Sequence, residues 1–353
     1  MSLIATRIAA VKVNNPRFDR NLTRPLEYGA LNLFVDQTNA GNSIINPELR
    51  TRALASMGTD IDIPVIKYDG EVTIANTRSC TIADNENTSA YYRVVWATLA
   101  AGFTMVPSAY SNNDISREQD FARKLEKISR AMAVKLDQMA IAALEANKTQ
   151  VFNDALFYGV TGNSLQVDWE DREGILSDLN SIMRGNAYPN MLHIVGNTGV
   201  DSLLRKLDQH GEYNDQNKRL EFADKVMHYT TNLANEEGKF GTLYAVEDGN
   251  VGVLTRVDRE AARGARSLGH EWDIVRLPFI DLPVGSHYYE TVGNQSAIVG
   301  DATADLTCAV KEHYGFSVDV AFIVAYNGAP TTIAQPIIKA EIASRTAATD
   351  ATE

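Results

Sequence analysis

Residues 120–148 read DFARKLEKISRAMAVKLDQMAIAALEANK, and this stretch contains neither glycine nor proline. Ser116 with Gln119 three residues later forms a capping-box pattern, and Asp114 is an alternative cap. We therefore predict one helix over residues 116–148, more than twice the average length of about 11 or 12 residues. Its apolar residues recur about every 3.7 positions, which indicates a straight helix rather than a left-handed coiled coil. The predicted buried stripe is Phe121, Leu125, Ile128, Met132, Leu136 and Met139.

A hairpin is predicted upstream of this helix. In residues 61–82, IDIPVIKYDGEVTIANTRSCTI, apolar and polar positions alternate on both sides of Asp69 and Gly70, a strong two-residue hairpin signal. A proline, two basic residues and an asparagine interrupt these strands, so we expect the hairpin to project as an arm. The next run, residues 91–107, is apolar enough to predict a strand buried on both faces.

The two ends of the chain have a different character. Residues 1–50 mix prolines, asparagines and glycines with isolated apolar residues, and no sustained period is visible, so we predict an extended arm. Its aromatic residues indicate that this arm lies on another surface. Residues 343–353 are small and polar and predict a frayed tail.

Alternating elements follow residue 160. We predict helices at about 170–185 and 198–209, with turn residues between the elements. The predicted strands are 191–195, 242–246, 251–257, 272–277 and 316–325. The fold class is therefore α+β.

Composition excludes several classes of protein. The chain has 353 residues and a formal charge of -12, which argues against broad non-specific binding to nucleic acid. Cys80 and Cys308 lack metal-ligand or redox spacing, which fits a reducing compartment. The longest apolar run, residues 94–106, is shorter than the about 20 residues of a spanning helix, so no membrane association is expected. Arg7 and Lys12 interrupt the N-terminal apolar residues, so no signal peptide is predicted.

Motifs of catalysis are missing from the sequence. The nearest phosphate-binding candidate is VGNTG, residues 195–199, but it lacks the lysine and third glycine, so an ordinary strand-to-helix turn is the better interpretation. Carboxylate clusters such as Glu170, Asp171 and Glu173 are typical of helix starts, and no pair stands out for acid–base chemistry. Six histidines are scattered without metal-ligand spacing and are interpreted as surface or core residues. They are His193, His210, His228, His270, His287 and His313.

One local basic segment is RVDREAARGAR, residues 256–266, with four arginines against two acids. A solvated or subunit-facing loop is favoured over a phosphate-contacting one, because the aromatic residues that often accompany nucleic-acid contact are absent from it. Both interpretations stay open at this point.

The order of these parts resembles the major capsid proteins of tailed bacteriophages, which share the Hong Kong 97 phage capsid fold. In the terms of that family, the extended hairpin loop is DIDIPVIKYDGEVTIANTRSC, the spine helix includes residues 120–148, and FSVDVAFIVAYNGAP, residues 316–330, is the returning strand. The resemblance implies an N-terminal arm, 1–50; an extended loop, 51–90; a peripheral domain, 91–158; an axial domain of mixed α/β structure, 159–312; return strands, 313–342; and a tail, 343–353.

The resemblance also implies a function. The chain would assemble with itself into pentamers and hexamers of an icosahedral shell that encloses double-stranded DNA without sequence-specific binding. It would be a structural component of the virion, assembled in the host cytoplasm, with no catalytic residue, cofactor or metal. Expected partners are a separate scaffolding protein, a portal and possible decoration proteins. The extended loop would contact a neighbouring subunit through Lys67, Tyr68, Asp69 and Gly70.

Some members of this family join subunits by a bond between lysine and asparagine. Lys67 beside the hairpin turn and Asn327 after the returning strand are the nominal pair. The reaction needs a nearby carboxylate, and the first acid after Asn327 is Glu341, so non-covalent contact is predicted.

The sequence leaves two alternatives to a phage capsid protein. An encapsulin, a cellular compartment with the same fold, ranks lower because those chains begin with a cargo-facing helix, whereas this N-terminus is predicted to be extended. An α+β enzyme that uses residues 196–215 ranks third.

Overall fold

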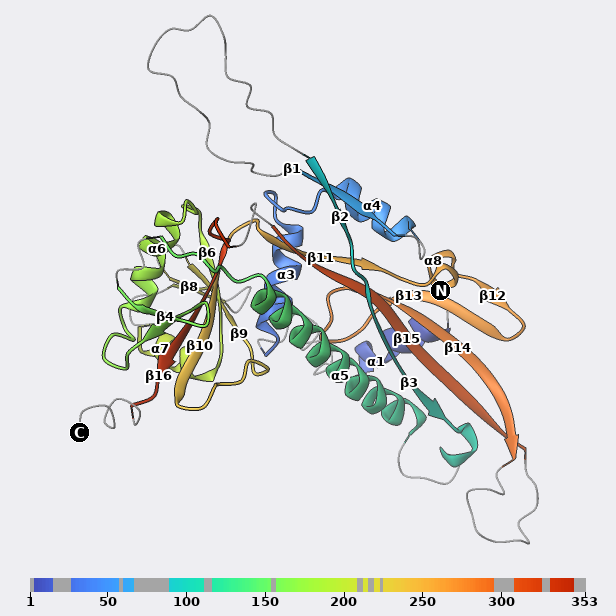
Figure 1. Cartoon of the computed structure of the whole chain (residues 1–353). Helices are drawn as coiled ribbons and strands as arrows, with labels where there is room; N and C mark the ends of the chain where they lie inside the picture. The colour runs from blue at the N-terminus through green and yellow to red at the C-terminus, as the bar shows by residue number, and fades with distance from the viewer. Residues whose placement is uncertain are drawn as a thin grey trace, which may run out of the picture.

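The computed structural model describes residues 3–14, 27–56, 60–66, 89–110, 116–153, 157–207, 212–214, 219–222, 225–294, 308–325 and 331–345. A long helix, α5, runs between two sheets (Figure 1). The fold is α+β, as predicted, and a hairpin, a long helix, a mixed domain and a returning strand follow in the expected order.

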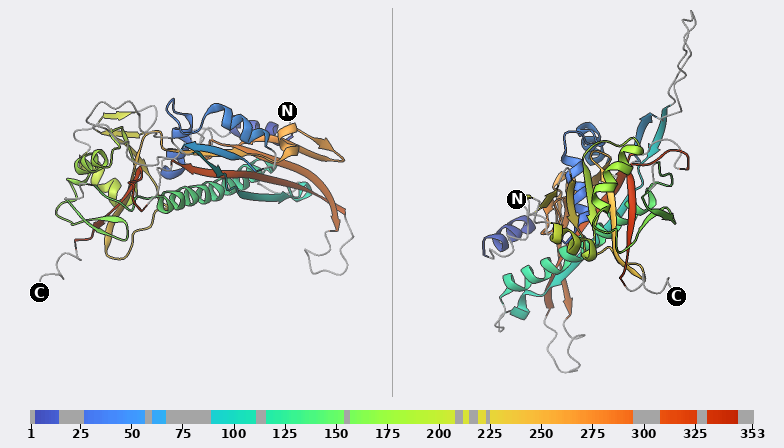
Figure 2. Two further views of the ribbon diagram at one scale, coloured as in Figure 1. Left: turned by 45° about the horizontal axis from the view of Figure 1, so that its top comes forward. Right: turned by 90° about the vertical axis from the view of Figure 1, so that its left-hand side faces the viewer.

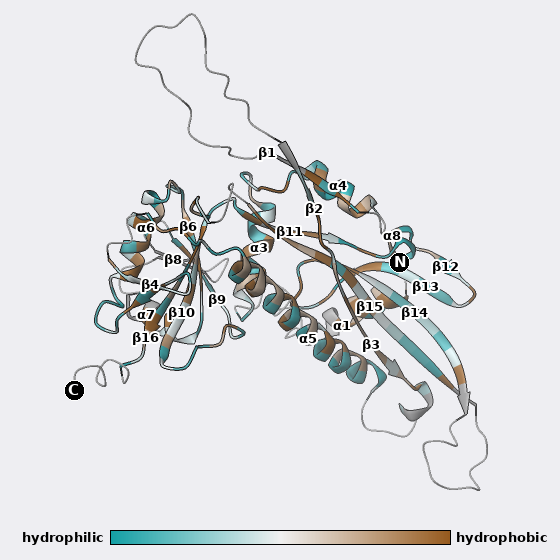
Figure 3. Ribbon diagram, viewed as in Figure 1, coloured by the Kyte–Doolittle hydropathy of each residue, from teal (hydrophilic) through white to brown (hydrophobic). Residues whose placement is uncertain are grey.

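The helix α5 spans Arg117–Ala146, which confirms the predicted helix. Both halves of the capping box form: the Ser116 hydroxyl accepts a hydrogen bond from the Gln119 N–H, and the Gln119 side chain accepts one from the Ser116 N–H, each at 3.2 Å. Figure 3 shows apolar and polar residues alternating along this helix. Of the six predicted stripe residues, Phe121, Leu125, Met132 and Leu136 are buried, while Ile128 and Met139 are half-buried.

The first sheet packs one face against α5. Its order is β11-β15-β14-β13-β12, and β3 pairs with β15 beside that path. Phe121 of α5 meets Tyr314 edge-on at 5.2 Å between ring centroids, and Phe103 stacks on Tyr314 at 5.0 Å. The strands are β3 (Ala97–Met105), β11 (Val251–Arg256), β12 (Arg266–Ser267), β13 (His270–Arg276), β14 (Pro283–Asn294) and β15 (Cys308–Val324).

The second sheet has the order β4-β5-β16-β10-β6-β9-β8-β7 and its own apolar core, to which α6 contributes. Figure 2 shows this sheet and its helices at one end of an elongated molecule. Its strands are β4 (Gly159–Thr161), β5 (Ser164–Val167), β6 (Leu192–Gly196), β7 (Glu212–Asn214), β8 (Arg219–Phe222), β9 (Lys225–Tyr229), β10 (Lys239–Glu247) and β16 (Ile337–Ala343). Its helices are α6 (Ile175–Gly185) and α7 (Thr198–Leu207).

The remaining elements are short. A 3-10 turn, η1 (Pro107–Tyr110), follows β3, and the helix α8 (Arg259–Arg263) packs on β13 and β14. β1 (Asp62–Ile66) pairs with β2 (Ser89–Arg93) as a separate two-stranded sheet. β1 therefore pairs with residues 89–93 and not with a strand directly after Asp69 and Gly70, so the predicted two-residue hairpin is corrected at its first strand. The predicted turn and its return strand at residues 72–82 lie outside the described residues.

The predicted extended arm over residues 1–50 is wrong where the structure describes it. Helices form at α1 (Leu3–Asn14), α3 (Gly29–Asn39) and α4 (Pro47–Ala55). The helix α3 is buried on most of its sides, between α5, β9 and β11, so its sequence shows no amphipathic period. In α1, Ile4, Ile8 and Val11 do follow helical spacing and are buried against the main core.

Two further expectations are corrected. The segment 91–107 is not one strand buried on both faces: it divides into β2 and β3, and β3 alternates half-buried and exposed residues because it packs one face on the core. The expected axial range 159–312 also includes strands β11 to β14, yet these pair in the same sheet as β15 and β3. Conversely, β16 lies within the expected return strands but pairs with β10 in the second sheet. The sheet to which each of these strands belongs is decided by antiparallel pairing with strands distant in sequence. The period of the sequence alone does not reveal that pairing.

Candidate assembly surfaces

The base of the projecting hairpin exposes apolar side chains. Tyr91 in β2 is 78% exposed, and Val95, just after that strand, is 77% exposed. An isolated two-stranded hairpin is at best marginally stable in water. Burial of these side chains on another surface would remove apolar area from water and stabilise the hairpin.

The predicted contact residues of the extended loop are not placed. Lys67, Tyr68, Asp69 and Gly70 lie outside the described residues, and so does Asn327. The proposed contact and the lysine–asparagine pair therefore stay predictions.

The outer face of the first sheet carries a row of stacked rings that sequence reasoning missed. We call His270, Trp272, His287, Tyr289 and His313 the ring row. Trp272 stacks on His287 at 4.5 Å between centroids, and Tyr289 stacks on His313 at 4.5 Å. The signal in the sequence was the spacing of two residues in His270/Trp272 and His287/Tyr289, which places each pair on one face of a strand.

The surroundings of the ring row disfavour the protonated forms of His287 and His313. His270 Nδ1 and His287 Nε2 lie 2.9 Å apart in a hydrogen bond. Burial, together with the nearby His270, lowers the pKa of His287. Burial and the nearby Lys311 lower the pKa of His313. His287 and His313 therefore gain positive charge only at a lower pH than a free histidine does.

A buried carboxylate fastens α1 to the start of α5. Glu312 of β15, whose side chain is 4% exposed, accepts hydrogen bonds from Arg7 of α1 and Arg117 of α5. The hydroxyl of Tyr314 donates to the same carboxylate at 3.0 Å. One buried acid therefore joins two basic residues from segments more than a hundred positions apart, a cluster that the sequence did not indicate.

The VGNTG segment is a packing turn. The Asn197 side chain accepts hydrogen bonds from the Val200 N–H at 3.4 Å and the Thr242 N–H at 3.3 Å, which caps α7. A β-carbon at Gly199 would lie 1.9 Å from the Phe240 carbonyl oxygen, so glycine is required by close approach of two backbones. This supports the interpretation as an ordinary strand-to-helix turn.

Two of the scattered histidines are core residues. His193 and His228 are buried and stack at 5.4 Å between centroids, with His193 Nδ1 3.1 Å from His228 Nε2. Gln37 of α3 donates to Asp248 at 2.6 Å and lies 2.8 Å from His193 Nε2. This polar network joins α3 to the second sheet, and in the described part of the chain no group of three or more candidate ligands could hold a metal ion.

The first arginine of the basic segment 256–266 is engaged within the chain. Arg256 Nε donates to Asp319 at 2.8 Å, and its guanidinium lies 4.4 Å from the centre of the Trp96 ring. Arg256 therefore packs within the chain, and its guanidinium is already paired with a carboxylate. This favours the solvated or subunit-facing interpretation of the loop over a phosphate site.

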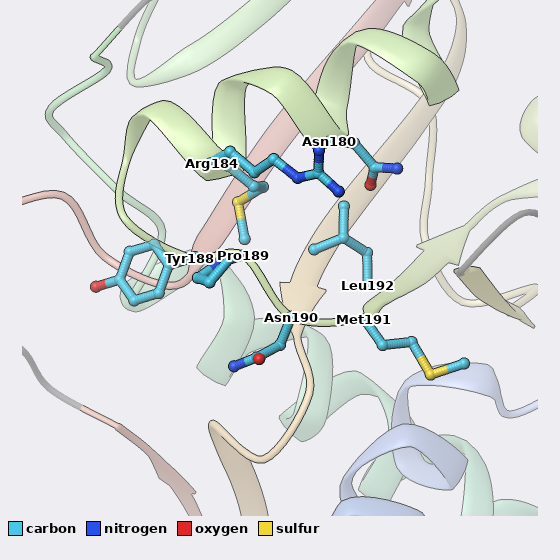
Figure 4. Close-up of a pocket in the computed structure, with 8 residues that line it drawn as sticks. Asn180, Arg184, Tyr188, Pro189, Asn190, Met191 and Leu192 are labelled. Carbon is cyan, nitrogen blue, oxygen red and sulfur yellow. The ribbon is translucent and has the colours of Figure 1, made fainter.

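A pocket of about 190 Å³ lies between α6 and β6 (Figure 4). Arg184 is the only charged residue among the eight that line it. The Tyr188 hydroxyl donates to the Ala334 carbonyl at 2.7 Å. These residues do not bring a base to a nucleophile, so the pocket offers no acid–base pair.

In the part of the chain that the structure describes, no helix has the length and apolar character needed to cross a membrane.

Comparison with known proteins gives structural matches alone. No protein-family model matches the chain, and no curated protein matches it. A solved structure from Mycobacterium phage Bobi is similar at 12% identity and a TM-score of 0.45, over 90% of this chain and 91% of that one. The mature capsid of bacteriophage PhiM1 is similar at 8% identity and a TM-score of 0.44, over 80% and 82% of the two chains. The SrpI encapsulin complex from Synechococcus elongatus is similar at 9% identity and a TM-score of 0.45, over 84% and 88%.

Proposed function

We propose that this chain is the major capsid protein of a tailed bacteriophage, a structural subunit that assembles with itself into pentamers and hexamers of an icosahedral shell. The observation that carries the proposal is the exposed hairpin base at Tyr91 and Val95, which projects from a body built around one long helix. A subunit of a closed shell needs surfaces that gain burial only on assembly.

The partners follow from this proposal. The shell encloses double-stranded DNA, and the chain's charge of -12 suits enclosure without wrapping by basic side chains. The partners that go with this role are a separate scaffolding protein that directs assembly, a portal, and decoration proteins that would bind the shell. Assembly takes place in the host cytoplasm, and the protein has no enzymatic role.

The test is electron microscopy of the full chain expressed alone, with sedimentation to size the particles. Closed shells of megadalton mass are expected. A chain that stays monomeric under every ionic condition would overturn the proposal. Boiling the shells in detergent tests the lysine–asparagine pair: a single band at the monomer mass is expected, and a ladder of multimers would show covalent links.

An encapsulin shell is the second candidate, and α1 favours it. The N-terminus was predicted to be extended, unlike that of an encapsulin, yet residues 3–14 are helical and pack on the main core. Particles purified from the native source separate the two: packaged DNA supports the capsid, and an enclosed protein cargo without DNA supports the encapsulin.

A further inference from the structure

The turn between β12 and β13 holds a leucine in a conformation that leucine rarely adopts. Ser267 pairs with His270, which leaves Leu268 and Gly269 as the two central residues of the turn. Their φ angles are +48° and +82°. A two-residue hairpin turn with both φ angles positive favours asparagine followed by glycine, because a branched apolar side chain crowds the left-handed backbone.

The same leucine is almost fully in water. Leu268 is 98% exposed, the highest exposure among the large apolar residues that the structure describes. Backbone strain and apolar exposure both disfavour this residue in an isolated subunit, and asparagine would relieve both. Such an outlier points to a role outside the isolated chain.

The chain also carries a pocket that suits a leucine side chain. It lies between α1 and the start of α5 and has a volume of about 180 Å³. The apolar side chains of Ala10, Val11 and Phe121 form part of its lining, together with polar and charged side chains. Glu118 lies on this lining and is exposed. Arg7 and Arg117 also line the pocket, but both already pair with the buried Glu312, so Glu118 is the exposed charge on the lining. Arg266, two residues before Leu268, is exposed and carries the charge opposite to that of Glu118.

We propose that Leu268 inserts into the pocket between α1 and α5 of a second copy of the chain, with Arg266 next to Glu118 of that copy. The contact deepens the proposed shell function and rests on it. Each copy offers both the leucine and the pocket, so the contact repeats from subunit to subunit as a shell requires. Burial of the leucine offsets on assembly the strain and exposure that the free subunit carries.

The first test is Leu268→Asn in the full chain, with assembly followed by light scattering over a concentration series. The concentration needed for half-assembly is expected to rise at least about tenfold, the effect of losing one buried leucine per contact. The melting temperature of the unassembled variant is expected to equal or exceed that of the wild type, because asparagine suits the turn. Assembly at wild-type concentrations would overturn the contact alone. A wild-type chain that forms no particles would instead overturn the shell function, and the contact with it.

The second test addresses the pocket. Ala10→Trp fills it from the exposed side of α1, and we expect a similar rise in the half-assembly concentration, with no further rise in the double variant. Normal assembly of Ala10→Trp would overturn the assignment of this pocket. Ser267→Ala is the matched control in the same turn, and it should assemble like the wild type. A rise as large as that of Leu268→Asn would overturn the role of the apolar side chain.

Discussion

The Asp137 carboxylate in the middle of α5 accepts a hydrogen bond from the backbone N–H of Leu31 in the first turn of α3, at 2.8 Å. Tyr28 begins α3 without a side-chain cap of its own, so a residue 106 positions away satisfies that N–H. The same carboxylate accepts from the Thr230 hydroxyl at 2.5 Å and the Asn232 amide at 2.9 Å. Asp137 therefore joins the long helix, an N-terminal helix and the segment after β9.

Replacing the Asp137 carboxylate should destabilise the contacts between α5, α3 and the segment after β9. Asp137→Ala leaves three donors without their acceptor in a fully buried site, and we expect a loss of about 3 kcal/mol in the free energy of unfolding. Urea denaturation of the unassembled chain measures it. The control is Gln138→Ala on the exposed side of the same helix, with a change within about 0.5 kcal/mol. Equal losses in the two variants would contradict the role of Asp137.

The same residue should give the stability a defined pH dependence. Burial raises the pKa of Asp137, although hydrogen bonds from Thr230 and Asn232 oppose that shift. A folded-state pKa above the unfolded value means that the charged form disfavours folding, so the contribution of Asp137 to stability rises as pH falls towards the unfolded pKa of about 3.9.

Asp137→Asn keeps the shape of the side chain and cannot titrate, so it isolates this effect. The free energy of unfolding of the wild type minus that of the variant should increase between pH 7 and pH 4, measured by denaturation at each pH. A difference that stays constant or decreases would mean that Asp137 is not destabilised as an anion.

Glu312 should hold α1 in place. Glu312→Ala removes a buried acid that pairs with Arg7 and Arg117, and we expect a loss of about 3 to 5 kcal/mol, because two arginines lose their charge partner. Faster tryptic cleavage at Arg7, read by mass spectrometry, should accompany it. Glu126→Ala removes an exposed pair with Arg130 and should change stability by under about 1 kcal/mol. Unchanged cleavage in Glu312→Ala would rule out this anchoring.

The long helix was predictable because its signals are local. Ser116 and Gln119 mark its start, and Leu125 and Leu136 repeat on one stripe, so no knowledge of its neighbours was needed. In α3, by contrast, Leu31, Leu33, Phe34 and Val35 are all buried, and partners on several sides erase the period. The formation of α3 depends on tertiary contacts, which the helix propensities of its residues do not encode.

The candidate surfaces were less predictable than the fold. The ring row requires His287 opposite Trp272 and Tyr289 opposite His313, and this register is set by the pairing of β14 with β13 and with β15. The exposed leucine turn depends on a backbone angle at Leu268, which the residue type argues against. Sequence period identifies which residues share a face of one strand, while contacts across strands need the folded chain.

Gly199→Ala should separate a packing turn from an anion site. The new β-carbon would meet the Phe240 carbonyl oxygen at 1.9 Å, so the backbone must move, and we expect a loss of more than about 2 kcal/mol in thermal or urea unfolding. Thr198→Ala in the same turn should be milder. Phosphate should not raise the melting temperature of the wild type, and stabilisation by millimolar phosphate that Gly199→Ala abolishes would restore the anion-site interpretation.

Leu136→Asp tests whether the fold of the subunit depends on the packing of the long helix α5. Leu136 lies on the face of α5 that packs into the main core, and it is fully buried. An aspartate there must lose its hydration or unfold the helix, so we expect no soluble particles. Lys127→Ala lies on the exposed side of the same helix and should assemble like the wild type. Lys124→Ala should also be mild, because its pair with Asp120 is partly exposed. Electron microscopy and circular dichroism of the three variants decide the point: normal particles from Leu136→Asp would show that this helix does not carry the fold.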